Sequence, residues 1–293
     1  MMLEELPEPT RMERLFVALQ RRLPTIGLST FMFRIAEMRQ PLIKNMMIRW
    51  FVAKYRVNLA EAEFERIEDY LNFNTFFTRA LKNGARKQPL DADIVSSPAD
   101  GVISQSGPIL GDALLQVKGE EYTLGALLAE TELAEEFRDG HFCTIYLAPG
   151  DYHRVHMPFT GRLRRWAYIP GKLYSVNAVT SQLMPQLFVQ NERMVAMFDT
   201  QFGPMAVVMV GALLVGGLQT SWLGRLTPPH HQESAASYYE QMNPLRLVRG
   251  AELGQFHMGS TVILLVPRGA LNWRDHVRAG RTVRVGEELA EIV

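Results

Sequence analysis

The sequence predicts an α+β protein in which N-terminal amphipathic helices precede a mostly antiparallel, β-rich core. Two observations carry this prediction: residues 10–88 have apolar side chains at helical spacing, and residues 89–293 have short β-rich runs separated by Gly and Pro. An alternating βαβ rhythm is missing, which argues against a doubly wound parallel sheet. We therefore predict a helical region over 1–88 and a β-rich domain over 89–293.

Composition narrows the class of protein. The chain has 293 residues, of which 47% are hydrophobic and 21% charged, so it is globular and not disordered. Its 31 basic and 31 acidic residues give a net charge of zero, which argues against a general nucleic-acid binder. The single cysteine, Cys143, excludes an intrachain disulfide and fits a reducing compartment.

The first helical region combines apolar and basic residues. The stretch from Arg11 to Arg56 has ten Lys or Arg residues against two Glu residues, a net charge of +8. Apolar residues on one side and basic residues on the other are typical of helices that lie in a membrane interface. A helical subdomain packed on its own core, with Arg residues facing water, is the alternative interpretation.

A membrane-spanning helix is not expected. The longest apolar run, Met205 to Leu218, has 14 residues, whereas a spanning helix needs roughly 20. The start of the chain lacks the basic-then-apolar order of a secretory signal.

The β-rich region contains eight runs that we expect to form strands. Between them, residues 124–137 show a short helical pattern, and the tail is expected to pair two short strands around Gly280 and Gly286. The expected strands are 94–96, 102–104, 114–118, 142–147, 162–169, 194–199, 205–215 and 261–266.

Two stretches contain residues that could do chemistry. In "SSPADGVISQ", Asp100 precedes a glycine and by itself indicates a turn. In "LAPGDYHRVHMPFTG", His153 and His156 place two of the seven histidines within four residues. Two histidines can supply two metal ligands, but no further cluster of Cys or His has the matching spacing apart from His230-His231 in a Pro-flanked loop, so we expect no metal site. A general base is the other interpretation, because His titrates near neutral pH.

A third stretch, "LGQFHMGSTVILLVP", places Gly259, Ser260 and Thr261 directly before a run of strand formers. The ordinary interpretation is a turn. The surroundings do not match the Gly-x-Ser-x-Gly elbow of an α/β-hydrolase. Asp, His and Ser in one chain are nevertheless the components of an activated nucleophile.

Five separated motifs together resemble the phosphatidylserine decarboxylase family of the bacterial proenzyme type. They are "SPADGVISQ", "YHRVHMPFTG", "PGKLYSVN", "NERMVAMFDTQFGPMAVVMVGALLVGG" and "LGQFHMGSTV", in matching order over nearly the whole chain. The family's more usual Leu-Gly-Ser-Thr stands here as Met258-Gly259-Ser260-Thr261, an apolar exchange at the first position.

The resemblance implies that the chain makes its own cofactor. The precursor would cut itself between Gly259 and Ser260, and Ser260 would become a covalent pyruvoyl (pyruvate) group. By the family pattern His156 is the base and Asp100 supports its imidazole, as in other triads. The fragments 1–259 and 260–293 would remain together as a heterodimer, which leaves a higher oligomer open.

The resemblance also implies the reaction. The pyruvoyl ketone forms a Schiff base with phosphatidylserine and accepts the electrons released with carbon dioxide, and hydrolysis then frees phosphatidylethanolamine. His153 and His156 are both candidates for the proton donor to the carbanion. Candidate head-group contacts are Lys172, Tyr174, Ser175 and Asn177 in "PGKLYSVN".

A lipid substrate also explains the basic N-terminal helices, because each Lys or Arg near an anionic bilayer contributes about 1 kcal/mol of attraction. We expect a peripheral protein on the cytoplasmic face of the cell membrane, bound to phosphatidylserine in an anionic bilayer and not to nucleic acid. The alternatives are a pyruvoyl-dependent decarboxylase of a soluble amino acid, a Ser-His-Asp hydrolase that keeps its serine, and a membrane-binding module without catalysis.

Overall fold

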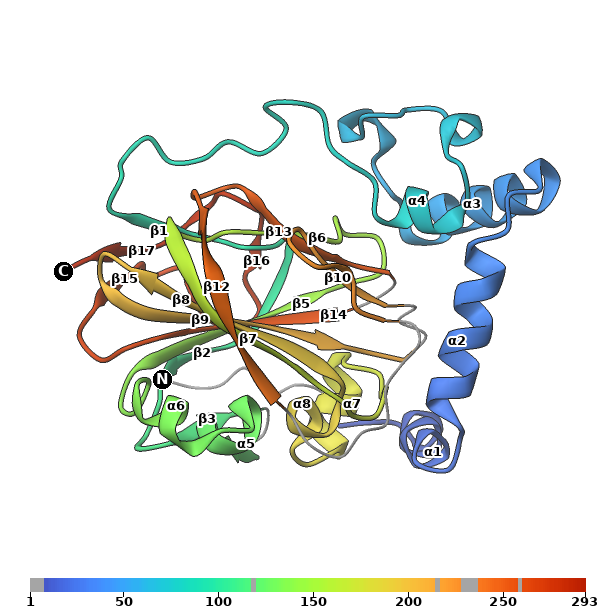
Figure 1. Cartoon of the computed structure of the whole chain (residues 1–293). Helices are drawn as coiled ribbons and strands as arrows, with labels where there is room; N and C mark the ends of the chain where they lie inside the picture. The colour runs from blue at the N-terminus through green and yellow to red at the C-terminus, as the bar shows by residue number, and fades with distance from the viewer. Residues whose placement is uncertain (1–7, 117–119, 214–216, 228–236, 258–259) are drawn as a thin grey trace.

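The computed structural model describes residues 8–116, 120–213, 217–227, 237–257 and 260–293. It shows N-terminal helices followed by an antiparallel β-rich core, which confirms the predicted fold class (Figure 1). The helical part ends with α4, and the first strand begins at Ile94, so the predicted boundary at residue 88 falls in the segment between them. The N-terminal elements are α1 (Arg11–Gln20), α2 (Thr25–Ala36), α3 (Pro41–Tyr55), two 3₁₀ turns (Leu59–Glu61, Ile67–Asp69) and α4 (Phe73–Phe77).

One large antiparallel sheet forms the centre of the core. Its eight strands, in spatial order, are β12 (Ser237–Leu247), β7 (Gly161–Ile169), β8 (Arg193–Thr200), β9 (Gly203–Gly211), β14 (Ser260–Val266), β5 (His141–Leu147), β2 (Gly101–Pro108) and β16 (Thr282–Val283). The central position of β14 means that it hydrogen-bonds to a neighbour on each side.

Three smaller sheets and four short helices accompany the large sheet. The sheets are β11 (Gly224–Arg225), β10 (Leu218–Thr220), β13 (Glu252–Phe256) and β6 (Arg154–His156); β1 (Ile94–Ser96), β17 (Glu288–Ile292) and β15 (Leu271–Trp273); and β3 (Ala113–Leu115) with β4 (Glu121–Thr123). The helices are α5 (Leu124–Leu128), α6 (Thr131–Glu135), α7 (Ala178–Leu183) and α8 (Leu187–Gln190).

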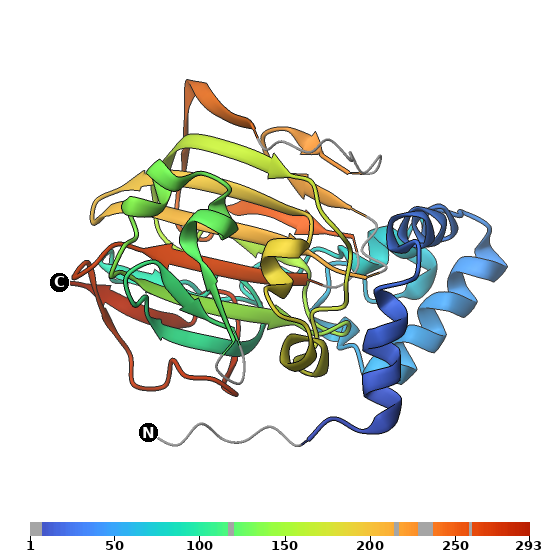
Figure 2. The same cartoon turned by 90° about the horizontal axis from the view of Figure 1, so that it is seen from below.

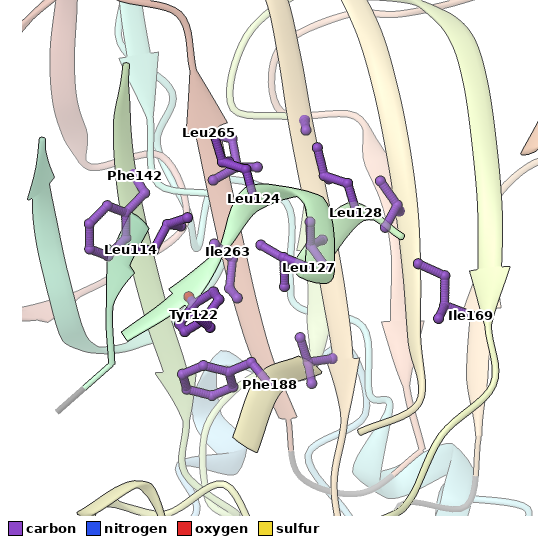
Figure 3. Packing of buried hydrophobic residues seen from close by; sticks show 14 of the residues in the cluster. Leu114, Tyr122, Leu124, Leu127, Leu128, Phe142, Ile169, Phe188, Ile263 and Leu265 are labelled. Carbon is purple, nitrogen blue, oxygen red and sulfur yellow. The ribbon is translucent and has the colours of Figure 1, made fainter. Parts of the chain in front are cut away.

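The large sheet is buried on both faces. Side chains of a strand alternate between faces, and β14 shows this fully because every one of its residues is buried. Ile263 and Leu265 pack toward Leu124, Leu127 and other residues of the layer that α5 and α8 form (Figure 3). Strands buried on both faces are apolar throughout, which is why this run was recognisable in the sequence.

The opposite face of β14 points to the smaller sheets. Val262 and Leu264 belong to a second apolar cluster with Val155 of β6 and Phe256 of β13. Residue 260 has the same parity as these two residues and therefore lies on this second face. The alternation thus places the first side chain of β14 on the side of the strand that contains His156.

The tail differs from the expected hairpin. The short strand β16 pairs with β2 in the large sheet, whereas β17 pairs with β1 and β15 in another sheet. The glycines do turn the chain, since Gly280 and Gly286 both have positive φ. Turn signals indicate where a strand ends but not which strand it will pair with, and here the partners are β2, β1 and β15.

The N-terminal helices lie along one side of the β core in both views (Figures 1 and 2). Their inward face is narrow: in α3 it consists of Lys44, Ile48 and Phe51, and the Lys44 ammonium donates to backbone carbonyls of the following segment. Their outward face is rich in apolar side chains, and Leu42 is 88% exposed while Trp50 is 58% exposed. The apolar residues of α3 are therefore split between the two faces, with Ile48 and Phe51 inward and Leu42 and Trp50 outward.

The exposed apolar residues of α1–α3 are intermixed with exposed basic ones. Arg11, Arg14, Arg34, Arg49 and Lys54 are all exposed on the same three helices. In the described part of the chain, every helix is too short or too polar to cross a membrane.

Candidate active site

Ser260 is the first residue of β14 and is paired with Leu147 of β5 on one side and Gly211 of β9 on the other. Its side chain is fully buried, and its Oγ has no hydrogen-bond partner among the described residues. A buried polar group without a partner costs about 1–3 kcal/mol, so such groups in a folded core call for a functional explanation. Gly259, the other half of the predicted cleavage site, lies outside the described residues.

His156 ends β6, on the face of the large sheet that Ser260 shares. Its Nδ1–H donates to the carbonyl of Gly250 at 2.8 Å, and the hydroxyl of Tyr152 donates to its Nε2 at 2.9 Å. Burial lowers the pKa of His156, although the bond to Gly250 and the charge of Asp100 oppose this. The imidazole is therefore neutral near pH 7 and able to accept a proton, but Tyr152 occupies the accepting nitrogen.

Asp100 lies in the turn before β2 and is buried. Its carboxylate accepts from Arg86 Nε at 2.9 Å and from the backbone N–H of Val285 at 2.8 Å, and it also bonds to Arg86 Nη2. Among the described residues it makes no hydrogen bond with His156, so its influence on that imidazole is through charge.

Arg86 is a residue that the sequence analysis missed. It joins Asp100 to Glu61 of the helical region, with an Nη1–carboxylate distance of 2.8 Å. Although burial opposes its charge, the bonds to these two carboxylates raise its pKa above the usual range. No motif surrounds Arg86 in the sequence, because its partners come from segments 14 and 25 residues away.

A small pocket of about 180 Å³ opens next to His156. Its lining includes Arg86, Gln88, Tyr152 and Gly250, but not Ser260 or His153. Ligand pockets generally measure about 300–1,000 Å³, so this pocket gives access to His156 but is too small for a phospholipid.

His153 precedes β6 and is fully buried. Its Nδ1–H donates to the carbonyl of Asp151 at 2.8 Å, which fixes the tautomer, and its Nε2 has no partner among the described residues. The ring packs on Phe77 of α4 with a centroid distance of 4.1 Å. Burial lowers the pKa of His153 to about 3, and the nearby charge of Arg79 adds to this effect.

His257, which the sequence analysis did not single out, is a second buried imidazole and precedes Ser260 by three residues. Its Nδ1 has no partner in the described chain, and its Nε2 lies 3.3 Å from Oε1 of Gln219. Burial lowers the pKa of His257 to about 4, and the charge of Arg225 acts in the same direction. The sequence signal that could have identified His257 is its position three residues before Ser260.

The segment with the predicted head-group residues lies beside the end of β9, because the Asn191 amide donates to the carbonyls of both Tyr174 and Gly211, the residue paired with Ser260. Asn177 caps α7 by accepting from the N–H of Thr180, and Tyr174 is buried in the apolar cluster on the opposite face of the sheet. The backbone N–H of Ser175 donates to Gln20 of α1, and Lys172 is exposed. Their predicted role in binding the head group stays a prediction.

The described residues contain no group of three or more His, Cys, Asp or Glu side chains that could hold a metal ion. His230 and His231 lie outside the described residues.

Comparison with known proteins shows that the chain is similar to members of one family. Residues 73–291 match the family model described as phosphatidylserine decarboxylase, and residues 15–56 match a second model described as PSD. A phosphatidylserine decarboxylase proenzyme of Saccharophagus degradans is 47% identical over 279 residues, which cover 95% of this chain and 97% of the relative. The proenzyme of Hahella chejuensis is 44% identical over 282 residues (96% and 95%), and that of Pseudomonas aeruginosa is 46% identical over 280 residues (95% and 97%).

An antiparallel core with a buried serine at the start of its central strand, whose hydroxyl has no partner among the described residues, combined with these matches, defines a decarboxylase. The chain belongs to the phosphatidylserine decarboxylase family.

Proposed function

We propose that this protein decarboxylates phosphatidylserine to phosphatidylethanolamine with a carbonyl group made from its own Ser260. The observation that carries the proposal is the buried Ser260 hydroxyl, which has no partner in the described chain, in a member of this decarboxylase family. The matched relatives are named proenzymes, which supports a precursor that is processed before it acts.

The processing step is a cut between Gly259 and Ser260. Ser260 Oγ attacks the carbonyl carbon of Gly259, a base takes the hydroxyl proton, and the peptide nitrogen gains a proton as the acyl group moves to oxygen. Loss of the Cα proton of Ser260 then expels Gly259 as a carboxylate. The remaining dehydroalanine takes up one water and releases ammonia, which leaves a ketone as a pyruvoyl group at the start of fragment 260–293.

The two fragments would remain associated because of where the cut lies. Strand β14 begins at residue 260 and runs between β5 and β9, which both belong to fragment 1–259. The new N-terminus is thus held in the middle of the large sheet by two ladders of backbone hydrogen bonds. This supports the predicted heterodimer of cleavage fragments.

His156 acts as the base for the cut, and Asp100 supports it. A neutral imidazole is needed for this role, and burial of His156 keeps its pKa low. The hydrogen bond from the Tyr152 hydroxyl to Nε2 of His156 must first break, because Nε2 is the nitrogen that receives the serine proton. The negative charge of Asp100 then stabilises the imidazolium that forms, although the direct partner of the Asp100 carboxylate is Arg86.

The surroundings of residue 260 suit a pyruvoyl group. The position is fully buried, shares a face with Val262 and Leu264, and has no polar partner in the described chain that would compete for the new carbonyl. Such a group supplies an electron sink for the bond that breaks when carbon dioxide leaves. The Nε2 of His153 has no partner in the described chain, so this imidazole stays the candidate for passing a proton to the substrate.

The helical region would bring the enzyme to its substrate. Exposed apolar side chains and a net charge of +8 on the segment from Arg11 to Arg56 fit a surface that docks on an anionic bilayer. The free, buried Cys143 fits the reducing side of the membrane, so we place the protein peripherally on the cytoplasmic face.

Intact mass spectrometry of the purified protein tests the proposal. We expect two masses, for fragment 1–259 and for fragment 260–293 with a ketone in place of its amine. Hydroxylamine or borohydride should inactivate this protein, which should release carbon dioxide from phosphatidylserine in vesicles. A single unmodified polypeptide that retains decarboxylase activity would contradict the proposal, and one without it would favour a hydrolase or a lipid-binding module.

A further inference from the structure

Arg79 is a buried cation that follows α4. It is 5% exposed, and its Nη2 donates to the carbonyls of Gly150 at 2.9 Å and Asp151 at 3.1 Å. Its Nε and Nη1 have no hydrogen-bond partner among the described residues, and no described carboxylate forms an ion pair with it. The guanidinium lies over the ring of Phe76, 5.7 Å from its centroid, and Asp100 and Asp151 act on it through charge, but none of these interactions occupies Nε or Nη1. Burying a charge without an ion-pair partner costs free energy, so the fold retains this guanidinium at a penalty.

Two other arginines with little exposure, Arg193 and Arg86, make the hydrogen bonds expected of a guanidinium removed from water. Arg193, which is 3% exposed, donates from Nε, Nη1 and Nη2 to four backbone carbonyls. Arg86 bonds to two carboxylates. Arg79 has neither arrangement, and burial lowers its pKa. Two of its nitrogens are therefore available for an acceptor that the described chain does not provide.

The position of Arg79 connects it with the candidate active site. Its Nη2 and the Nδ1 of His153 donate to the same oxygen, the carbonyl of Asp151. That loop begins directly after Leu147, the residue paired with Ser260 in the sheet. The unpartnered nitrogens of Arg79, Nε2 of His153 and Oγ of Ser260 thus belong to the same end of the large sheet.

We propose that Arg79 binds the phosphodiester oxyanion of the lipid head group, an inference that rests on the proposed function. A guanidinium presents paired N–H donors that match the geometry of a phosphate, and the bonds are strengthened where water is excluded. The donors that remain free, Nε and Nη1, supply this contact, while Nη2 keeps the loop that carries His153 in place.

The head group also has a carboxylate, but its chemistry makes it the less suitable partner. The carboxylate loses its charge as carbon dioxide leaves, so a guanidinium bound to it would stabilise the substrate more than the transition state and slow the reaction. The phosphate keeps its charge throughout. A contact to the phosphate stabilises the substrate and the transition state equally, which lowers KM and leaves kcat unchanged.

The test uses the purified, cleaved enzyme with dioctanoyl phosphatidylserine as substrate. Arg79→Gln should raise KM by roughly tenfold or more, as expected for a lost charged hydrogen bond, while kcat changes less than about threefold. Dioctanoyl phosphatidylethanolamine retains the phosphate but not the carboxylate, so its inhibition constant should rise in Arg79→Gln by the same factor as KM. Arg79→Lys, which retains the charge without the fork, should give an intermediate effect.

Several results would overturn this inference. An unchanged KM in Arg79→Gln would overturn it. A raised KM with unchanged inhibition by the product would also overturn it, because that result would mean that Arg79 binds the carboxylate. Failure of folded Arg79→Lys to cut itself would assign the arginine to processing instead. Arg193→Lys serves as the matched control for losing a buried guanidinium, and it should leave KM and product inhibition unchanged.

The inference can fail separately from the proposed function. Calorimetric binding of dioctanoyl phosphatidylethanolamine to the purified wild-type and Arg79→Gln proteins requires no turnover. A wild-type protein without decarboxylase activity would reject the proposed function, whereas equal binding of the product by both proteins would reject the role of Arg79.

Discussion

The β core and the N-terminal helices of this protein place their apolar side chains in opposite directions. In the core, β14 is buried on both faces, between the layer of α5 and α8 and the smaller sheets. In the helices, the inward face is narrow and large apolar residues such as Leu42 and Trp50 point outward. The core buries its apolar side chains internally, whereas the helices bury one cluster and leave many large apolar side chains exposed, and it is this exposed surface that we propose docks on a bilayer.

The candidate active site lies where these two regions meet. Phe77 of α4 packs on His153, and Phe33 of α2 contacts His257 with a ring-centroid distance of 6.0 Å. Glu61 of the helical region shares Arg86 with Asp100. The chemistry would thus depend on the core, and access to the lipid on the helices. Substitutions in the two regions should separate these effects.

The largest effect is expected in the core, at Ser260. Ser260→Ala removes the only atom that can attack the Gly259 carbonyl, so the chain should remain one band on a denaturing gel and show no decarboxylation. Ser260→Cys retains a nucleophile and should cut, more slowly. Cleavage of folded Ser260→Ala would exclude the serine hydroxyl as the attacking group.

The next largest loss of processing is expected from substitutions of the residues that activate the Ser260 hydroxyl. His156→Ala and Asp100→Asn should each leave the folded chain uncut, with processing slowed at least 100-fold, because general base catalysis typically contributes 10²–10⁴ in rate. The measurement is the fraction of cut chain on a gel over time. Normal cleavage by His156→Ala would remove this histidine from the base role.

The Asp100 substitution needs a control because the carboxylate also pairs with Arg86. Glu61→Gln removes the other carboxylate of that arginine and leaves Asp100 in place. We expect Glu61→Gln to cut itself normally and to be only moderately less stable. If both variants failed to cut, the ion-pair cluster would be acting through structure rather than through His156.

A smaller loss of activity is expected from substitutions in the helices, and only when the substrate is in a membrane. Replacing Leu42, Met46 and Trp50 together by Ser should lower activity on anionic vesicles roughly tenfold or more, since each exposed apolar side chain contributes about 1.5–3 kcal/mol when it is buried. Activity on monomeric dioctanoyl phosphatidylserine should remain within about twofold. Vesicle flotation and the two rates measure this.

The matched control replaces exposed apolar residues outside the helices. Leu90, Leu110 and Val248 are also exposed, and their replacement by Ser should leave vesicle binding unchanged. Equal losses in the two triple variants would mean that exposed apolar area, wherever it lies, governs binding, and that the helices have no special role.

The comparison of the two regions also shows how much of the fold the sequence could predict. The expected strands 94–96, 142–147, 162–169 and 194–199 match β1, β5, β7 and β8 to within a residue. They could be predicted because they are short runs of strand-forming residues separated by Gly and Pro. Strands with mixed or polar composition, β12 and β13, were not expected, since nothing in their local pattern distinguishes them from loops.

In the helices, spacing predicted the elements but not their orientation. A helix that faces a bilayer and a helix that faces a core have the same apolar periodicity, so the pattern of residues 43–51 could not show that Ile48 and Phe51 point inward while Met46 and Trp50 point outward. Tertiary packing decides this, through the aromatic cluster that Phe51 forms with α4.

For the site, motifs could indicate residues but not their hydrogen bonds. Asp100, His153, His156 and Ser260 all lie in motifs, and the structure places them in or beside the core strands. Arg79 lies in no quoted motif, and its role depends on partners it lacks, which only coordinates can show. Single-sequence reasoning detects unusual residue types, whereas an unsatisfied donor is a property of the three-dimensional environment.

The smallest effect is a pH dependence of stability that arises where helices and core meet. Burial lowers the pKa of His257 to about 4, below its ordinary value of about 6.5, so the folded state favours the neutral ring. The stability from this group is fully present above pH 6.5 and is lost as the pH falls toward 4. At pH 5 the loss is about 2 kcal/mol for this imidazole.

Urea unfolding of the uncut Ser260→Ala chain at pH 7.5 and pH 5.0 measures this loss in a single polypeptide. Adding His257→Gln should reduce the loss of unfolding free energy by about 2 kcal/mol, whereas adding His276→Gln, at an exposed position, should not change it. Equal losses in both variants would place the acid sensitivity elsewhere, in the core imidazoles His153 and His156. A smaller loss of unfolding free energy in His257→Gln would instead show that the acid sensitivity arises at His257, where its ring contacts Phe33 of α2.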